Sequence, residues 1–260
     1  MKQLIKLPAE ENPIISVIIP SLNEEKHIAL LLNSLKDQRT ITYEVFVIDG
    51  GSTDKTAEIA HQYDATVAII PGCGEFPSRN VGARLARGKF LLFTCADTIL
   101  SDELLLNVVG KFDERPELIA LTGPGYPMDA SLFGKLEYLI YNVIRFGFAS
   151  LPKSLKRFST STNFLVVRKK IFSKIGGFDV DEINADGIIG RKLLKMGEVA
   201  FFPDTYVYIS ARRMENMGFF GFNKHYLYIF ENLFFFLSKT RIMKTLKLRS
   251  MMKHRKIHEN

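Results

Sequence analysis

The sequence predicts an α/β fold in which helices flank a mostly parallel central sheet. Short apolar strands alternate with helical segments through the first half of the chain, which is typical of βαβ units with right-handed crossovers. Three of these strands lead into an acid or an amide, at Asn23, Asp49 and Asp97. Because the carboxyl ends of parallel strands meet at one edge of a sheet, we expect these side chains to lie close together there.

The elements of this first half follow a regular order. The first strand, 14–19, is an apolar run that ends at Pro20, and the helix over 24–37 has apolar residues at helical spacing. Ser52, Thr53 and Asp54 are typical capping residues and predict a helix that runs to about residue 63. The other expected elements are strands over 43–48, 66–70 and 89–94 and helices over 80–87 and 102–112.

The pattern changes after the Gly-Pro-Gly segment at 123–125. A helix within 132–148 is apolar almost all round, and such a helix is either buried or in contact with lipid. The remaining expectations are a strand over 163–167, a turn at 176–179, a helix over 186–196 that ends at Gly197, and strands over 199–202 and 205–209.

Composition and charge narrow the class of protein. The chain has 260 residues, of which 47% are hydrophobic and 24% charged, so it is globular and can bury one substantial core. Its two cysteines, Cys73 and Cys95, are too few for a disulfide framework and favour a reducing compartment. No aromatic platform is interleaved with the basic residues, so nucleic acid is not expected as a partner.

The end of the chain combines an aromatic run with a basic tail. Most of the net charge of +7 lies in the tail that begins at Lys239, which favours an anionic membrane surface, although a solvated tail explains it too. The preceding run, 219–237, has almost the length of a membrane span, but Lys224 and Glu231 lie within it and charges inside a span are costly. An interfacial helix, a buried helix and a dimer contact remain open for this run.

Seven ordered motifs resemble those of the family 2 glycosyltransferases with a GT-A fold. They are SVIIPSLNEE, YEVFVIDGGSTDKT, SRNVGARLARGKFLLF, CADT, STSTNFLVVRKKIFSKIGGFD, ADGIIGRKL and SARR, and they cover residues 14–213. The resemblance implies a GT-A domain over 1–213, with a nucleotide-binding half at about 14–122 and an acceptor half at about 123–213. Residues 214–260 would then form the aromatic helix and the membrane-proximal tail.

The resemblance also implies an activity. It is the inverting transfer of a hexose from a nucleoside-diphosphate sugar, with UDP or GDP as the nucleotide, to an acceptor hydroxyl or a lipid phosphate. The acceptor would be a glycan or a polyprenyl lipid, and the cofactor a divalent cation, Mn²⁺ or Mg²⁺. Together with the basic tail, this places the protein in the cytoplasm, peripheral on the cytoplasmic face of the cell membrane.

Several residues would bind the nucleoside. In relatives, the acid that corresponds to Asp49 accepts a hydrogen from the nucleobase, and Pro20, Asn23 and Glu24 match residues that line the nucleoside. Turn capping is the alternative explanation for Asn23 and Asp49.

A second group would bind the diphosphate. Asp97 matches the acid that holds the cation bridging the pyrophosphate, and the departing diphosphate needs such positive charge. Arg79, Arg212 and Arg213 are candidates to clamp the phosphates as bidentate donors, with an ordinary surface role as the alternative.

The chain departs from the family pattern at the metal motif. The usual Asp-x-Asp is Cys95-Ala96-Asp97 here, and a neutral thiol is a poor ligand for a hard cation. Weaker metal affinity or altered ribose contacts are therefore predicted. A zinc site is not expected, because Cys73 and Cys95 lack the spacing of zinc ligands.

Asp186 is the candidate catalytic base, since it matches the second acid of a two-acid motif whose first position is Ala185. An inverting transfer needs one base to take the proton of the attacking hydroxyl, although helix capping would also explain an Asp at this place. Thr162 and Asn163 lie where relatives hold the donor sugar or the acceptor. The lone histidines at 27, 61 and 225 are expected at the surface.

One competing function is a degenerate GT-A domain that binds a nucleotide sugar or a partner without catalysis. It is suggested by the replacement of the first acid in both motifs, at Cys95 and at Ala185. Asp97 and Asp186 argue against it because each retains the second acid.

Overall fold

The computed structural model describes residues 12–38, 40–179 and 185–212. The predictions for Arg213, for the aromatic run at 219–237 and for the basic tail lie outside the described residues.

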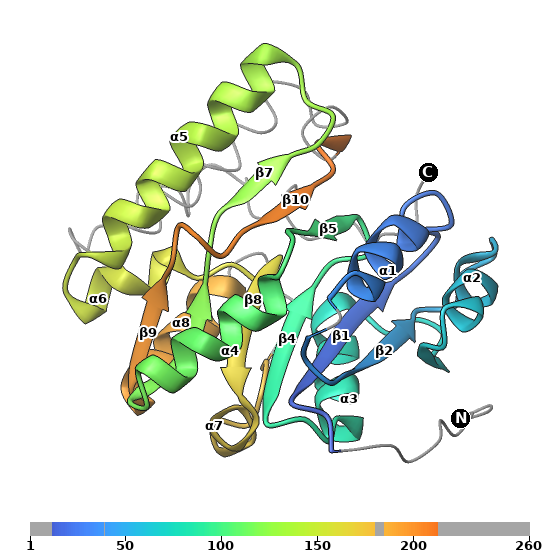
Figure 1. Cartoon of the computed structure of the whole chain (residues 1–260), viewed down its shortest axis with the longest axis horizontal. Helices are drawn as coiled ribbons and strands as arrows, with labels where there is room; N and C mark the ends of the chain where they lie inside the picture. Colours follow the sequence, from blue (N-terminus) through green and yellow to red (C-terminus); the bar gives the residue numbers. More distant parts are fainter. Residues whose placement is uncertain (1–11, 39, 180–184, 213–260) are drawn as a thin grey trace, which may run out of the picture.

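A seven-stranded sheet forms the centre of the molecule, in the order β3-β2-β1-β4-β8-β6-β9 (Figure 1). Its strands are β1 (Ile15–Ser21), β2 (Tyr43–Asp49), β3 (Thr66–Ile69), β4 (Phe90–Thr94), β6 (Leu118–Thr122), β8 (Phe164–Arg168) and β9 (Glu198–Phe201). β1 pairs in parallel with β2 and β4, β2 with β3, and β6 with β9, whereas β8 is antiparallel to both β4 and β6. The predicted α/β fold with a mostly parallel sheet is confirmed.

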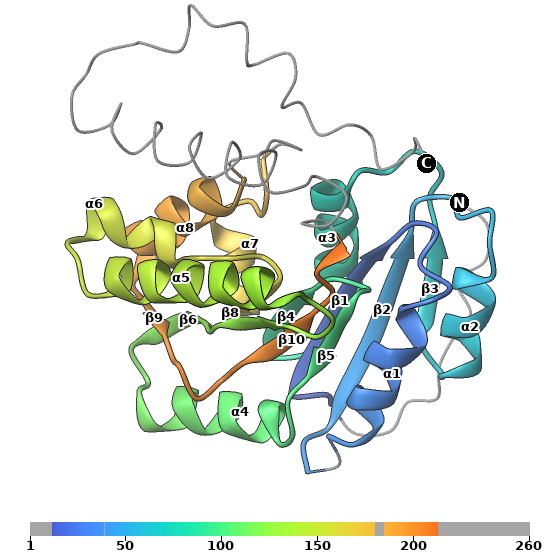
Figure 2. The ribbon, with the colours of Figure 1, turned by 90° about the horizontal axis from the view of Figure 1, so that it is seen from above.

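Helices cover both faces of this sheet (Figure 2). One face carries α1 (Ile28–Lys36), α2 (Thr56–Gln62) and α4 (Leu104–Glu114), and the other carries α3 (Glu75–Leu85), α7 (Lys169–Lys174) and α8 (Ala185–Met196). β1 is therefore apolar on both sides: Ile15, Val17 and Ile19 pack toward α1 and α4, while Ile18 packs toward α3. A strand buried on both faces reads as a continuous apolar run, as the sequence does here.

Helix α3 lies especially close to β1. A Cβ atom at Gly82 would stand 2.5 Å from Cγ2 of Ile18, so only glycine permits this approach. The helix begins at Glu75, five residues before the expected start at 80. The added first turn contains Pro77, which is tolerated there because the backbone N–H of a first turn has no helical partner.

A smaller sheet of three strands was not predicted. It consists of β5 (Thr98–Leu100), β10 (Val207–Ile209) and β7 (Gly125–Pro127), with β10 antiparallel to β5 and parallel to β7. Strands of three residues are too short to show a periodicity. This sheet has a functional consequence, because the N–H of Ser210 donates to the carbonyl of Asp97 at 3.0 Å and so brings the end of β10 to the end of β4.

The long helix α5 (Leu132–Ala149) follows β7 and leads to the short helices α6 (Lys153–Lys156) and η1 (Arg157–Ser159). In Figure 1, α5 lies along the outer margin of the molecule, beyond β7 and β10. The sequence predicted this helix as either buried or in contact with lipid, and the structure leaves much of its apolar side exposed. No helix in the described part of the chain is long and apolar enough to cross a membrane.

Candidate functional site

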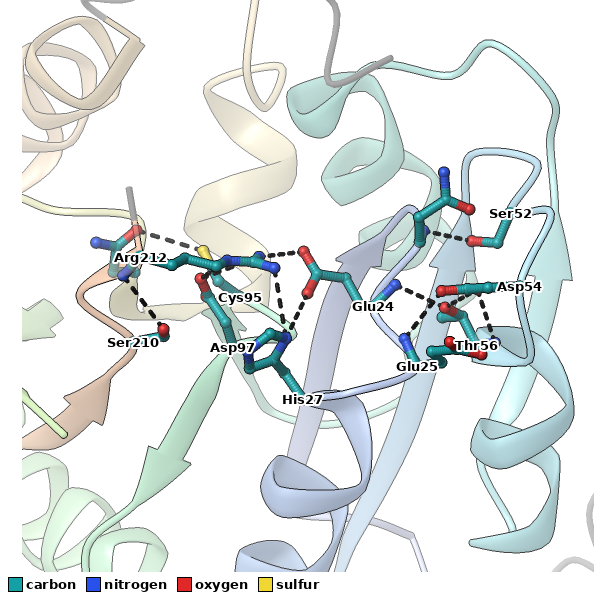
Figure 3. Close-up of polar contacts among 12 residues, drawn as sticks. Glu24, Glu25, His27, Ser52, Asp54, Thr56, Cys95, Asp97, Ser210 and Arg212 are labelled. Atoms are coloured by element: carbon teal, nitrogen blue, oxygen red, sulfur yellow. Dashed lines mark hydrogen bonds and ion pairs between the residues drawn. The ribbon is translucent and has the colours of Figure 1, made fainter. Parts of the chain in front are cut away.

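The carboxyl ends of β1, β2 and β4 meet at one edge of the sheet, as the sequence predicted. Glu24 follows β1, Asp49 is the last residue of β2, and Asp97 follows β4. Arg212 reaches the same edge from the end of β10 (Figure 3). The structure thus brings together side chains from four strands that are far apart in the sequence.

Arg212 links two acidic side chains at this edge. Its Nη2 donates to Oε1 of Glu24, and its Nε donates to Oδ2 of Asp97 at 3.2 Å (Figure 3). The two carboxylates are largely buried, with side-chain exposures of 12% and 15%. Burial lowers the pKa of the Arg212 guanidinium, but the contacts with Glu24 and Asp97 outweigh it and raise that pKa above its ordinary value.

One oxygen of Glu24 pairs with Arg212, and the other, Oε2, faces the imidazole of His27. Burial raises the pKa of its carboxyl, while the hydrogen bond and the charge of Arg212 oppose that rise. Its Oε2 is buried and accepts no hydrogen bond from the described residues. A buried oxygen in this condition is a ready acceptor for a ligand or a cation.

His27 belongs to the same cluster, although the sequence analysis assigned it to the surface. Its Nδ1 lies 3.4 Å from Oε2 of Glu24 and 3.4 Å from Nη1 of Arg212, and the side chain is 24% exposed. The signal in the sequence was its position three residues after Glu24, in the turn that opens α1.

Asp49 is almost completely buried, and its carboxylate is saturated with local contacts. Oδ1 accepts from the N–H groups of Gly51 and Ser52 at 2.8 and 2.6 Å, and Oδ2 accepts from the hydroxyls of Ser52 and Ser21 at 2.6 and 3.2 Å. These contacts use the four acceptor positions of a carboxylate. A hydrogen bond to a nucleobase would require one hydroxyl to turn away, so this role of Asp49 stays a prediction.

Asn23 holds the neighbouring loop in place. Its φ of 53° is in the left-handed region, which asparagine tolerates better than most residues. Its Oδ1 accepts from the N–H of Thr53 at 2.9 Å, and its own N–H donates to the hydroxyl of Ser52 at 2.8 Å. Pro20 lies within β1, opposite Ile48. For both residues, contact with a nucleoside stays a prediction.

A second polar cluster surrounds Arg79, which is fully buried. Its Nη1 donates to the carbonyl of Thr162 at 2.9 Å and its Nη2 donates to Oε1 of Glu75 at 2.7 Å, with Sγ of Cys95 3.4 Å away. Burial lowers the pKa of this guanidinium, but the charge and the hydrogen bond of Glu75 help to raise it overall. A phosphate would have to displace these protein partners, so the phosphate role of Arg79 stays a prediction.

Asp186 faces the same segment from the first turn of α8. Its Oδ1 accepts from the N–H of Thr162 at 3.1 Å, so Arg79 and Asp186 hold the carbonyl and the N–H of the same residue. Burial raises the pKa of Asp186, and the hydrogen bonds from Thr162 oppose that rise. Asn163 is adjacent: its Oδ1 accepts from the thiol of Cys95 at 3.3 Å.

The donor atoms at the sheet edge can serve a cation only together with a ligand. Among the described residues, no group of three or more His, Cys, Asp and Glu side chains could hold a metal ion. Asp97 offers one carboxylate and Glu24 one oxygen without a hydrogen bond. Such a set fits the usual mode of Mg²⁺, which is held by one or two carboxylates and completes its coordination with substrate phosphates.

The mostly parallel sheet and the acid-bearing strand ends define a GT-A glycosyltransferase fold. The chain belongs to glycosyl transferase family 2, because the model of that family matches residues 16–176.

Curated relatives support this assignment. The poly-beta-1,6-N-acetyl-D-glucosamine synthase of Staphylococcus epidermidis is 25% identical over 204 residues, which are 73% of this chain and 48% of that protein. The poly(ribitol-phosphate) beta-N-acetylglucosaminyltransferase TarS of Staphylococcus aureus is 36% identical over 108 residues, or 38% of this chain and 19% of that protein. The chain thus spans about half the length of the first relative and less of the second.

Solved structures share the fold. The mannosyltransferase PcManGT from Pyrobaculum calidifontis, in complex with GDP-Man and Mn²⁺, superposes with a TM-score of 0.60 at 21% identity, over 81% of this chain and 61% of that one. S. aureus TarS 1–349 in complex with UDP gives a TM-score of 0.60 at 22% identity, over 75% of this chain and 60% of that one.

Proposed function

We propose that this protein is an inverting glycosyltransferase that moves a sugar from a nucleoside-diphosphate sugar to an acceptor hydroxyl or a lipid phosphate. The observation that carries the proposal is the Glu24–Arg212–Asp97 cluster at the carboxyl edge of the sheet in a family 2 chain. Ligands bind at this edge in open α/β sheets.

The diphosphate of the donor would bind at this cluster. The Arg212 guanidinium can turn from its two carboxylates to phosphate oxygens, for which its planar fork is suited. Asp97 and Oε2 of Glu24 would hold a Mn²⁺ or Mg²⁺ ion, which when bound adds positive charge beside the leaving diphosphate. The complexes of PcManGT with GDP-Man and of TarS with UDP support a UDP- or GDP-linked donor.

Asp186 would act as the general base. As the acceptor oxygen forms its bond to the anomeric carbon, its proton passes to the Asp186 carboxylate, and the bond from that carbon to the diphosphate breaks with its electron pair on the phosphate oxygen. Attack opposite the leaving group inverts the anomeric centre. Thr162 and Asn163 would contact the acceptor, and the hydrogen bond from Thr162 orients the base. An ionised lipid phosphate would need no such base.

We also propose a peripheral location on the cytoplasmic face of the cell membrane. The basic tail that begins at Lys239 and the aromatic run before it support this location.

Nucleotide release tests the function. UDP-, GDP- and dTDP-sugars are offered with Mn²⁺, Mg²⁺ or EDTA to the wild type, to Asp97→Ala and Asp186→Asn, and to the control Asp204→Ala, which alters an acid that pairs with Lys111 at the surface. We expect metal-dependent release from one donor, lost in the first two variants and kept in the control. Equal release by Asp97→Ala would contradict the assignment of the site.

The second candidate function is a silent GT-A domain. It is favoured by Cys95, which occupies the first position of the metal motif and bonds to Asn163. Saturable donor binding without release, with both lipid-linked and soluble acceptors present, would support this alternative over catalysis.

A further inference from the structure

Helix α5 has its amphipathic faces reversed. Its outer side carries large apolar residues that are about half exposed or more: Leu132 (84%), Phe133 (77%), Leu136 (52%), Leu139 (53%), Ile140 (50%), Val143 (61%) and Phe146 (49%). Its buried residues are Gly134, Asn142 and Arg145. A surface helix normally turns its apolar stripe toward the core and its polar residues toward water.

Hydrogen bonds fix this orientation. Arg145 donates from Nε and Nη2 to the carbonyl of Ser159, from Nη1 to that of Gly123 and from Nη2 to the hydroxyl of Thr122, at 2.9 to 3.1 Å. Asn142 accepts from the N–H of Gly125 at 3.3 Å and donates to the carbonyl of Gly125 at 2.9 Å. These two hydrogen bonds pair backbone groups of the edge strand β7. Turning the apolar side inward would break all of these contacts, so the stripe belongs at the surface.

The exposed stripe is too wide for a single helical partner. With 3.6 residues per turn, its seven side chains span an arc of about 140° along a helix about 27 Å long. A partner helix covers only a narrow seam, whereas a flat apolar layer covers an arc of this width. Contiguous exposed apolar surface of this kind marks an interaction site.

We propose that the outer face of α5 docks onto the surface of an anionic lipid bilayer, with the helix axis in the plane of the interface. Basic residues accompany the stripe: Lys135 is exposed at its edge, and α6 adds the exposed Lys153 and the partly exposed Lys156. The basic tail of the sequence adds charge of the same sign. An apolar face with adjoining cations is the pattern of an interfacial helix, which lies on the membrane and does not cross it.

The inner face of α5 connects this surface to the candidate acceptor segment. Arg145 holds the carbonyl of Ser159, three residues before Thr162, which bonds to Asp186. A docked bilayer would therefore lie one helix diameter, about 10 Å, from the segment 159–163. This consequence rests on the proposed function, and it favours an acceptor carried on a membrane lipid over a soluble glycan.

Tryptophan fluorescence of the full-length chain tests the docking surface. The sequence contains no tryptophan, so Val143→Trp places a single probe on the stripe, and Leu106→Trp places a matched probe at an exposed leucine of α4. Each variant is mixed with vesicles of phosphatidylcholine alone or with phosphatidylglycerol, with and without brominated acyl chains. We expect a blue shift and bromine quenching for Val143→Trp on the anionic vesicles, and neither for Leu106→Trp.

Three results would overturn the proposal. Equal responses at both positions would mean unspecific adsorption, and no response at either would mean that the face does not meet lipid. Emission from Val143→Trp that is blue-shifted without vesicles and unchanged by them would mean that the chain's own C-terminal segment or a second copy covers the stripe. The assay needs no donor or acceptor, so a negative result leaves nucleotide release as an independent test of the enzyme.

Discussion

Arg212 is the residue that balances the charge at the sheet edge, because it forms ion pairs with both Glu24 and Asp97. Removing one partner of such a cluster leaves a buried charge uncompensated, which is costly. In the absence of a ligand, Arg212 keeps the two carboxylates from repelling each other. In the proposed complex, Glu24 and Asp97 would hold the cation, and the Arg212 guanidinium would bind the phosphates.

The pKa of Asp186 predicts the pH dependence of transfer to a hydroxyl acceptor. A general base must be deprotonated, and burial raises the pKa of Asp186 above the ordinary 3.8. With Asp186 as the proposed base, we expect activity to be lost as the pH falls through this raised pKa. We expect kcat/KM to show an acidic limb above pH 3.8 in the wild type, and Asp186→Asn to lose both the limb and most of the rate, by about 100-fold or more.

The control for this profile is Asp179→Asn, which alters an exposed acid that pairs with Lys192. It should keep the limb and the rate. An unchanged limb in residual activity of Asp186→Asn would mean that another group is the base.

The sequence was sufficient to predict that Glu24, Asp97 and Arg212 lie together at one edge of the sheet, because strand ends and motif order place them, while their role in donor binding stays a prediction. It did not predict the position of His27, because its spacing of three residues from Glu24 indicates a contact only once the turn that opens α1 is known. Nor did it predict that Arg79 is fully buried, because two of its partners, Cys95 after β4 and Thr162 before β8, lie outside its own helix in the sequence.

At the scale of elements, the orientation of α5 is the feature that sequence periodicity left open. Apolar residues occur almost all round the helix, so the pattern alone does not say which side is buried. Two polar residues, Asn142 and Arg145, decide it through hydrogen bonds to backbone groups of β7 and η1. The three-residue strands β5 and β7 were missed for a related reason: they are defined by pairing with β10, and not by a pattern of their own.

A pair of substitutions in α5 tests this orientation. Arg145→Met should lower the free energy of unfolding by about 2–4 kcal/mol, because it leaves buried carbonyls and a hydroxyl without donors. Leu139→Ser should change it by no more than about 0.5 kcal/mol, since that side chain is 53% exposed. Urea unfolding of the detergent-free protein measures both values, and a larger loss for Leu139→Ser would mean that the stripe is buried in solution.

At the level of the whole molecule, both halves of the chain contribute to the candidate site. The parallel half, β3-β2-β1-β4, presents the acids, while the strands and helices after β6 supply Arg212, Asp186 and the apolar helix α5. The order of strands and helices in the first half was predictable, because regular alternation specifies it. The smaller sheet, β5-β10-β7, depends on long-range pairing of three-residue strands, so it was found only in the structure.

The proposed donor site is the Glu24–Arg212–Asp97 cluster. Calorimetric titration of UDP-, GDP- and dTDP-sugars with Mn²⁺, without acceptor, tests it most directly. Two variants change the site: Arg212→Ala removes the guanidinium, and Arg212→Lys keeps the positive charge but loses the planar fork of N–H donors. The control is Arg84→Ala, which alters an exposed arginine of α3.

We expect one donor to bind saturably. Its affinity should fall about tenfold or more in Arg212→Ala, less in Arg212→Lys, and not at all in Arg84→Ala. Circular dichroism of each variant confirms that it is folded. Two results would mean that this cluster is not the donor site. One is equally tight binding by folded Arg212→Ala, and the other is the failure of every donor to bind the wild type.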